Sequence, residues 1–229
     1  GQAQRLAASL REAGGVPLLF PTIEIADIKN PQAALLALGS LQDFDWAIFI
    51  SANAVEKTFA LMSPATWPAD LPVAAIGAAT AQALRAHGVK NIVMPKENFD
   101  SEALLALPEF QSLKNTCIVI LRGQGGRETL KQTLTGRGAQ VVYCETYRRT
   151  KPDIANTPLW LWLEQNKIQA IDVMSGESLA NLLELAGDAA LQLKQIPLLA
   201  HHPRVAQIAK DAGFPLVLTC ATDDAALMP

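Results

Sequence analysis

A glycine-rich turn with an arginine at each end occupies residues 122–127, in the order Arg-Gly-Gln-Gly-Gly-Arg. It follows a short apolar run at 117–121 and precedes a segment of helical periodicity. The planar guanidinium group of arginine pairs with a carboxylate through two parallel hydrogen bonds. Arg122 and Arg127 are therefore candidates to bind carboxylates, although two solvated surface arginines would give the same pattern.

This turn does not match the motifs of nucleotide-binding proteins. Arg127 and Glu128 stand where the third glycine of a GxGxxG motif belongs, and no Gly-Lys-Ser/Thr sequence follows, as a P-loop would require. We therefore expect the turn to bind a carboxylate-bearing ligand rather than a nucleotide.

Small or hydroxyl-bearing residues also occur at other expected strand-to-helix turns, at 51–53, 77–80, 100–101, 175–178 and 202–204. The free N–H groups and the positive dipole end of a helix N-terminus bind anions, and such turns lie where parallel sheets bind ligands. Helix capping explains each turn singly; together they favour ligand binding. The residues expected to bind substrate are Ser51, Ala52, Asn53, Gly77, Thr80, Ser101, Arg122, Gly123, Arg127, Ser175, Ser178 and Arg204.

Strands alternate with helices of about 10–15 residues along the chain, which predicts an α/β fold with parallel sheets. The expected strands are 16–20, 45–50, 72–77, 89–95, 117–121, 141–147, 169–175, 196–202 and 214–220. The expected helices are 3–13, 51–62, 78–88, 100–107, 127–137, 159–166, 176–187, 203–213 and one that begins within 222–229.

The composition excludes several classes of protein. Half of the 229 residues are hydrophobic, which is enough for a packed core, and a net charge of −3 gives no support for general nucleic-acid binding. No apolar run approaches the roughly 18 residues that a membrane-spanning helix needs. Cys117, Cys144 and Cys220 form no CxxC pair, and His201 and His202 have no ligand motif beside them. We expect no metal site, and three separate thiols in a cytoplasmic protein.

The chain contains an internal repeat. Residues 47–62 match 171–186, and residues 73–88 match 198–213, at a nearly constant offset. The helix and second strand of the glycine-turn unit match residues 1–23. The strand and turn before that helix have no such match, so we expect a strand and an arginine-bearing turn to precede Gly1.

The order of the repeats predicts two similar domains, one inserted into the other. Domain 1 would comprise residues 1–24 and 150–229, and domain 2 would comprise residues 25–149. The chain would cross between them twice, in two extended segments that can pair as a two-stranded antiparallel ladder, and a cleft would lie between the domains. One continuous doubly wound sheet with accidental similarity is the alternative.

Five segments together resemble the uroporphyrinogen-III synthase family, in their order and spacing. They are FISANAV at 49–55, IGAATAQAL at 76–84, DSEALL at 100–105, ILRGQGGRETL at 120–130 and GAQVVYCETYRR at 138–149. The resemblance covers nearly the whole chain. It implies two α/β domains joined by a two-stranded ladder, with the active site in the cleft.

The resemblance also implies a reaction. The family are lyases that cyclise hydroxymethylbilane to uroporphyrinogen III, with inversion of ring D and loss of water. It implies no cofactor and no metal, and we expect a cytoplasmic monomer without nucleic-acid or membrane partners. The family is thought to use a cleft tyrosine, but residues 159–166 here carry Trp160 and Trp162 instead. Tyr147, near the expected cleft, is the candidate proton donor to the departing hydroxyl.

A second class of protein shares the expected architecture. A non-catalytic binding protein of the periplasmic-receptor type also has two α/β lobes and a hinge. The motif order and the unpaired cysteines favour the synthase.

Overall fold

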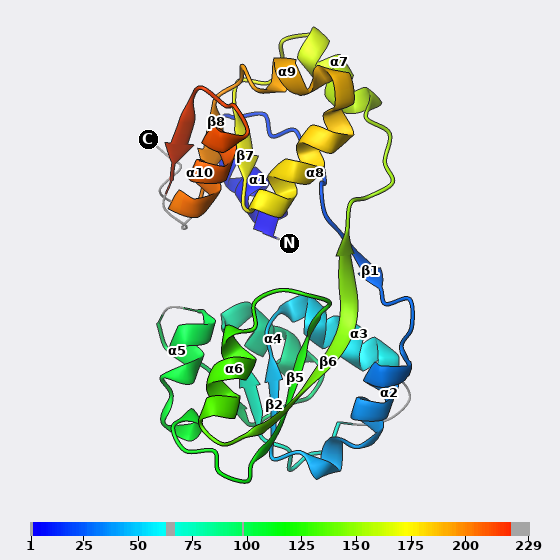
Figure 1. Ribbon diagram of the computed structural model, residues 1–229. Coiled ribbons are helices and arrows are strands. Elements are labelled where there is room, and N and C mark those ends of the chain that lie inside the picture. Colours follow the sequence, from blue (N-terminus) through cyan, green and yellow to red (C-terminus); the bar gives the residue numbers. More distant parts are fainter. Residues whose placement is uncertain (1, 63–66, 98, 221–229) are drawn as a thin grey trace. The chain divides into compact units, whose positions relative to one another are not determined.

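The chain divides into two compact units, each described here by itself (Figure 1). The computed structural model describes residues 2–62, 67–97 and 99–220. Unit 1 comprises Gly1–Glu24 and Thr150–Pro229, and unit 2 comprises Ile25–Arg149. The helix expected to begin within 222–229 lies outside the described residues.

Six strands form one sheet in the order β1-β6-β5-β2-β3-β4. Their bounds are β1 Glu24–Asp27, β2 Trp46–Phe49, β3 Val73–Ala75, β4 Ile92–Val93, β5 Cys117–Gly123 and β6 Gln140–Thr150. Strands β2 to β6 pair in parallel, and β1 is antiparallel to β6. The chain passes between the units within β1 and near the end of β6. The predicted α/β class, with parallel sheets and a two-stranded antiparallel ladder, is confirmed.

Helices cover both faces of this sheet. Successive residues of a strand point to opposite faces, so alternate residues of β2 pack against different helices. Ala47 and Phe49 of β2 pack with residues of α2 Gln32–Gly39, α3 Ala52–Met62 and α4 Ala78–Ala86. Ile48, between them, packs with residues of α5 Ser101–Leu105 and α6 Thr129–Gly136. Two short 3-10 turns, Leu41–Asp43 and Pro108–Phe110, complete the unit. Helix α2 was not among the helices expected from the sequence.

The central strand β5 is buried on both faces, which explains its uninterrupted apolar run. Val119 and Leu121 belong to the cluster under α3 and α4, whereas Ile118 and Ile120 belong to the cluster under α5 and α6. Leu130 and Leu134 of α6, four residues apart, face the second cluster, as their spacing predicts.

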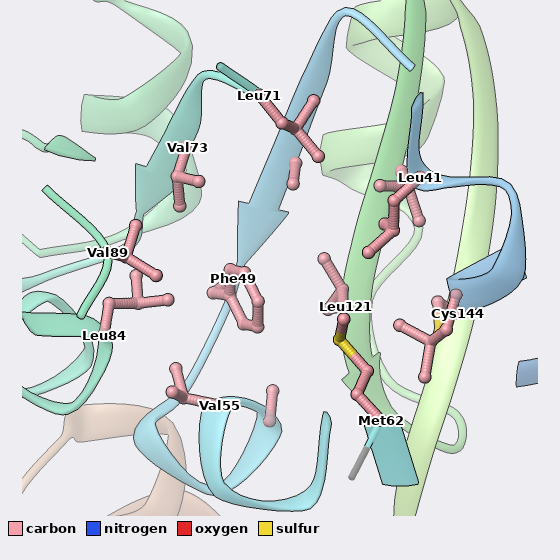
Figure 2. Close-up of a cluster of buried hydrophobic side chains, with 14 of the residues drawn as sticks. Leu41, Phe49, Val55, Met62, Leu71, Val73, Leu84, Val89, Leu121 and Cys144 are labelled. Atoms are coloured by element: carbon pink, nitrogen blue, oxygen red, sulfur yellow. The ribbon is translucent and has the colours of Figure 1, made fainter. Parts of the chain in front are cut away.

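The first cluster is drawn in Figure 2, where Phe49, Leu121 and Cys144 extend from neighbouring strands among aliphatic side chains. Cys144 is fully buried, and its Sγ donates to the carbonyl oxygen of Ala34 in α2 at 3.8 Å. Burial and the negative charge of Glu145 raise the pKa of this thiol to about 12. Cys144 is thus part of the core, and all three thiols are free.

Unit 1 holds a three-stranded parallel sheet in the order β7-β8-β9. Its strands are β7 Ile171–Val173, β8 Leu198–Ala200 and β9 Val217–Thr219. Its helices are α1 Gln2–Glu12, α7 Thr157–Glu164, α8 Gly176–Ala186, α9 Ala190–Leu193 and α10 Pro203–Asp211, with a 3-10 turn at Gly187–Ala189. The order and direction of these strands repeat those of β2, β3 and β4, in agreement with the sequence repeat.

One expected strand of unit 1 is not formed. Residues 16–20 have no strand structure, although the Phe20 and Trp162 rings form a T-shaped contact, with centroids 6.4 Å apart. Their counterpart by the sequence repeat is β6, which pairs with β5. Within the described part of unit 1 no strand corresponds to β5, so residues 16–20 lack the partner that a parallel strand requires.

The Cys144 thiol should resist alkylation in the native protein. Its raised pKa keeps it protonated at pH 9, where an unfolded cysteine is largely ionised, and the thiolate is the reactive form. We expect iodoacetamide at pH 9 to modify Cys144 at least roughly tenfold more slowly than Cys220, as measured by mass spectrometry of the peptides. In concentrated urea all three cysteines should react alike. Equal rates in the native protein would contradict this burial.

Candidate anion-binding site

Unit 2 contains a cavity of about 340 Å³ at the carboxyl ends of its parallel strands. The lining residues directly follow β2 and β3, or lie in the second half of β5, on β6, in the glycine turn and at the starts of α5 and α6. They are Ile50, Ile76, Asp100, Ser101, Ile120, Arg122, Gly123, Gly125, Gly126, Arg127, Leu130, Tyr143, Tyr147 and Arg149. Ligands bind at this edge in parallel α/β sheets.

The glycine turn forms one wall. Gly125 and Gly126 have φ angles of 71° and 101°, a left-handed conformation that side chains other than glycine rarely adopt. The N–H of Gln124 donates to the carbonyl oxygen of Tyr147 at 2.7 Å, and the N–H of Gly125 donates to Glu145 Oε1 at 3.2 Å. The turn is therefore fastened to strand β6.

Arg122 is buried, with 3% of its surface exposed. Its Nε donates to the carbonyl oxygen of Gly123 at 3.2 Å, its Nη2 to that of Gly125, and its Nη1 to that of Arg127 at 3.4 Å. Nη1 also lies 3.4 Å from Glu128 Oε1. Sequence reasoning made Arg122 a carboxylate clamp for a ligand; in the structure its guanidinium group binds its own turn.

Tyr143 lies against this arginine. The Arg122 guanidinium carbon lies 4.4 Å from the centre of the Tyr143 ring, and Lys131 Nζ lies 4.7 Å from it. The phenol donates to Glu128 Oε2 at 3.0 Å. Burial, followed by that hydrogen bond, raises the pKa of Tyr143 to about 12, so the phenol remains a donor at neutral pH.

Tyr147, the candidate proton donor, is also almost fully buried. Its hydroxyl lies 3.1 Å from Ser51 Oγ, and Ser51 Oγ accepts from the N–H of Ala54 at 3.0 Å. The Tyr147 ring lies over Gly123, where a Cβ atom would come within 2.6 Å of the ring carbons. Glycine at 123 thus permits the close packing of this tyrosine.

The cavity brings together only part of the predicted binding set. Ser101, Arg122, Gly123, Arg127 and Tyr147 line it, and Ser51 touches Tyr147 behind the wall. Four other predicted residues of unit 2 do not line it. Ala52 and Asn53 begin α3, Gly77 precedes α4 beneath Phe99, and Thr80 is buried within α4.

The three predicted residues of unit 1 lie in helix N-terminal turns. Ser175 Oγ accepts from the N–H of Ser178 at 3.0 Å and donates to the Ser178 hydroxyl, so this pair caps α8. Arg204 is exposed in the first turn of α10, where its N–H donates to His202 Nδ1 at 3.0 Å. Helix capping accounts for the observed contacts of both serines.

Sequence reasoning missed Tyr143, Asp100 and Arg149 as lining residues. Asp100 was expected only as part of a turn; its carboxylate accepts from the N–H of Ala103 at 2.7 Å and begins α5. Tyr143 could have been found, because its register partner is Ile120, two residues before Arg122 on the neighbouring strand.

Nothing in residues 2–62, 67–97 and 99–220 gathers three or more His, Cys, Asp or Glu side chains into a group that could hold a metal ion. Over the same residues, no helix combines the length and apolar character needed to cross a bilayer. The polar side chains that line the cavity carry guanidinium groups, hydroxyl groups and the carboxylate of Asp100.

A cavity lined by arginines at the strand carboxyl ends of a parallel α/β unit is typical of proteins that bind a small anionic molecule. The family model of uroporphyrinogen-III synthase HemD matches residues 4–228, so the chain belongs to the uroporphyrinogen-III synthase family. It is 33% identical over 216 residues to the uroporphyrinogen-III synthase of Escherichia coli (strain K12), covering 92% of this chain and 87% of that protein.

Solved structures support the fold. A mutant uroporphyrinogen III synthase from the extremely thermophilic bacterium Thermus thermophilus aligns with a TM-score of 0.61 over 99% of this chain and 92% of that one, at 18% identity. The uroporphyrinogen-III synthetase from Helicobacter pylori 26695 also gives a TM-score of 0.61, over 89% of this chain and 88% of that one, at 15% identity.

The contact between Gly123 and Tyr147 can be tested with two glycine substitutions. Gly123→Ala places a Cβ within 2.6 Å of the Tyr147 ring, so we expect unfolding free energy to fall by roughly 1–3 kcal/mol. Gly136, in α6, has no atom within 4 Å of such a Cβ, so Gly136→Ala should be neutral or stabilise by up to about 1 kcal/mol. Urea denaturation measures both. Equal effects would contradict the packing.

Proposed function

We propose that the protein is a lyase that cyclises hydroxymethylbilane to uroporphyrinogen III, with inversion of ring D and loss of water. The observation that carries the proposal is the arginine-lined cavity at the strand carboxyl ends of a chain that belongs to this family. Action as a cytoplasmic monomer, without a nucleic-acid or membrane partner, is part of the same proposal.

The substrate is rich in carboxylates, and the cavity suits such groups. Arg127 and Arg149 are exposed and line it, against the single carboxylate of Asp100 among the lining residues. Ser101 opens α5 at the same wall. A carboxylate held by Arg127 and the neighbouring N–H groups would fix one end of the linear tetrapyrrole. Further contacts at the unit 1 turns 175–178 and 202–204 remain part of the proposal.

Fixing the substrate is the larger part of catalysis here. The reaction loses hydroxide from ring A, and ring D then attacks through its substituted end to give a spiro intermediate that reopens and closes inverted. Unassisted closure gives the non-inverted isomer. The protein must therefore hold the chain so that the substituted end of ring D is the one presented, which is a task of orientation.

The Tyr147–Ser51 pair can assist the departure of hydroxide. Two hydroxyl hydrogens are available to this pair, and one of them lies between the two oxygens at 3.1 Å. Because Ser51 Oγ already accepts from the N–H of Ala54, the second hydrogen has no role within the pair. When Ser51 donates to Tyr147, the O–H of Tyr147, which lines the cavity, remains to donate to the departing hydroxyl.

The alternative, a non-catalytic binding protein of the periplasmic-receptor type, is less well supported. The family model and the curated relatives that match the chain over most of its length are named as uroporphyrinogen-III synthases. The alternative would share the cavity but would release its ligand unchanged.

The proposal is tested by adding freshly prepared hydroxymethylbilane to the protein and separating the porphyrin isomers after oxidation. We expect isomer III as the main product, formed faster than spontaneous closure. Isomer I alone, at the rate seen without protein, would contradict the assignment and would favour the binding protein.

Arg127 should contribute to substrate binding, because it is exposed at the cavity and the structure shows no ion pair of its side chain among the described residues. We expect Arg127→Ala to lower kcat/KM roughly threefold to tenfold, which corresponds to about 1 kcal/mol. Arg85, exposed in the last turn of α4 and not part of the cavity wall, is the matched control. Equal, negligible effects of Arg127→Ala and Arg85→Ala would remove Arg127 from the binding site.

A further inference from the structure

Arg122 is a buried cation whose hydrogen bonds are almost all internal. Four of the five N–H donors of its guanidinium group have acceptors in the chain, three carbonyl oxygens of residues 123–127 and the carboxylate of Glu128. A cation with 3% exposure requires such partners, because an unpaired buried charge is strongly destabilising. Arg122 therefore has little capacity left to bind a substrate carboxylate itself.

The carbonyl oxygens that accept hydrogen bonds from Arg122 fix the direction of the N–H group that follows each of them. In a trans peptide the C=O and the following N–H point in opposite directions. The oxygens of Gly125 and Arg127 face Arg122, so the N–H groups of Gly126 and Glu128 point away from it. Among the described residues, neither of these two N–H groups has a hydrogen-bond acceptor. They are two donors fixed in direction and available to an anion.

We infer that Arg122 is a positioning residue, which holds the glycine turn so that the N–H groups of Gly126 and Glu128 can bind a carboxylate of the substrate. The inference rests on the proposed function for the identity of the ligand. It differs from the role expected from the sequence, because Arg122 acts through the turn and not by pairing with the ligand.

Glu128 and Tyr143 hold Arg122 in place. Glu128 lies 3.4 Å from Arg122 through Oε1 and accepts from the Tyr143 hydroxyl at 3.0 Å through Oε2, so one carboxylate links the two side chains. The Tyr143 ring supports the guanidinium plane at 4.4 Å. Glycine is required at 126, because a Cβ there would lie 2.6 Å from Arg122 Nη2.

Lysine could not replace Arg122 in this role. Its ammonium group is a compact charge with three donors at one point, whereas the carbonyl oxygens of Gly123, Gly125 and Arg127 are bound by three different nitrogens of a planar group. A substitution that keeps the positive charge but not the planar set of three donor nitrogens should therefore lose the hydrogen bonds that hold the turn.

The sharpest test uses Glu128→Gln, which removes a negative charge beside the cavity while keeping the shape of the side chain. If Glu128 acted only through its charge, its removal would lower KM for an anionic substrate. If it positions Arg122 and the turn, KM should rise roughly threefold to tenfold with kcat changed less. Glu102→Gln, next to the cavity residue Ser101 and outside the contacts of Arg122, is the control and should leave KM unchanged or lower it.

Arg122→Lys and Arg122→Met separate charge from geometry. We expect both to raise KM by at least roughly tenfold, with lysine no better than methionine. A wild-type KM in Arg122→Lys, or a lowered KM in Glu128→Gln, would overturn the inference.

A readout without substrate keeps the inference separate from the proposed function. Trypsin cleavage after Arg127 should speed up roughly tenfold in Arg122→Lys and Glu128→Gln relative to the wild type and Glu102→Gln, because the turn is released. If the wild type forms no isomer III, the proposed function fails. The rate of trypsin cleavage still tests whether Arg122 and Glu128 hold the glycine turn in place. If isomer III forms but neither KM nor cleavage changes in the variants, the inference alone fails.

Discussion

The burial of β5 on both faces is the constraint from which the site follows. A strand that lies between β2 and β6 with helices on both sides favours apolar residues, and Cys117–Leu121 meets this condition. The strand continues for two further residues before it leaves the sheet, so Arg122 is buried with it. The chain must then supply acceptors for a guanidinium group, and the nearest are the carbonyl oxygens of the turn that follows. The turn conformation and the buried charge thus depend on each other, because the carbonyl oxygens of the turn are the acceptors of the guanidinium group.

A register shift places the two tyrosines of β6 on opposite faces of the sheet. Arg122 pairs with Glu145, but Gly123 pairs with Tyr147, so Thr146 is an extra residue in β6. Such a bulge reverses the alternation of side chains beyond it. Tyr143 consequently packs with the cluster under α5 and α6, while Tyr147 belongs to the cluster under α3 and α4. At the bulge, the missing side chain of Gly123 leaves room for the Tyr147 ring.

The sequence predicted what depends on local pattern and on the repeat. The run of β5, the paired leucines of α6 and the parallel pairing of strands in the two sheets follow from residue types and spacing. Residues 16–20 were wrongly predicted as a strand, since their apolar character specifies burial and not a pairing partner. The limits of the domains and the cleft between them stay predictions.

The site was harder to predict, because its chemistry depends on contacts between strands. An arginine beside glycines gives the same sequence whether it faces a ligand or its own turn; burial distinguishes the two, and burial depends on how far β5 extends. The bulge at Thr146 has no signature in a single sequence, so the face on which Tyr147 lies could not be assigned. Ser101 and Arg127 were found because helix N-terminal turns lie at the strand ends in any parallel sheet.

Repetition of the fold has not produced two equal sites. By the sequence repeat, Ile48 and Ile76 of unit 2 correspond to Asp172 and His201 of unit 1. Ile48 packs in the core and Ile76 lines the cavity, whereas His201 Nε2 lies 2.6 Å from Asp172 Oδ1. A strand position that is filled by apolar packing in one unit is filled by a hydrogen-bonded pair in the other. The same backbone can therefore place helix N-termini in both units, while the side chains around them determine which turns are open to an anion.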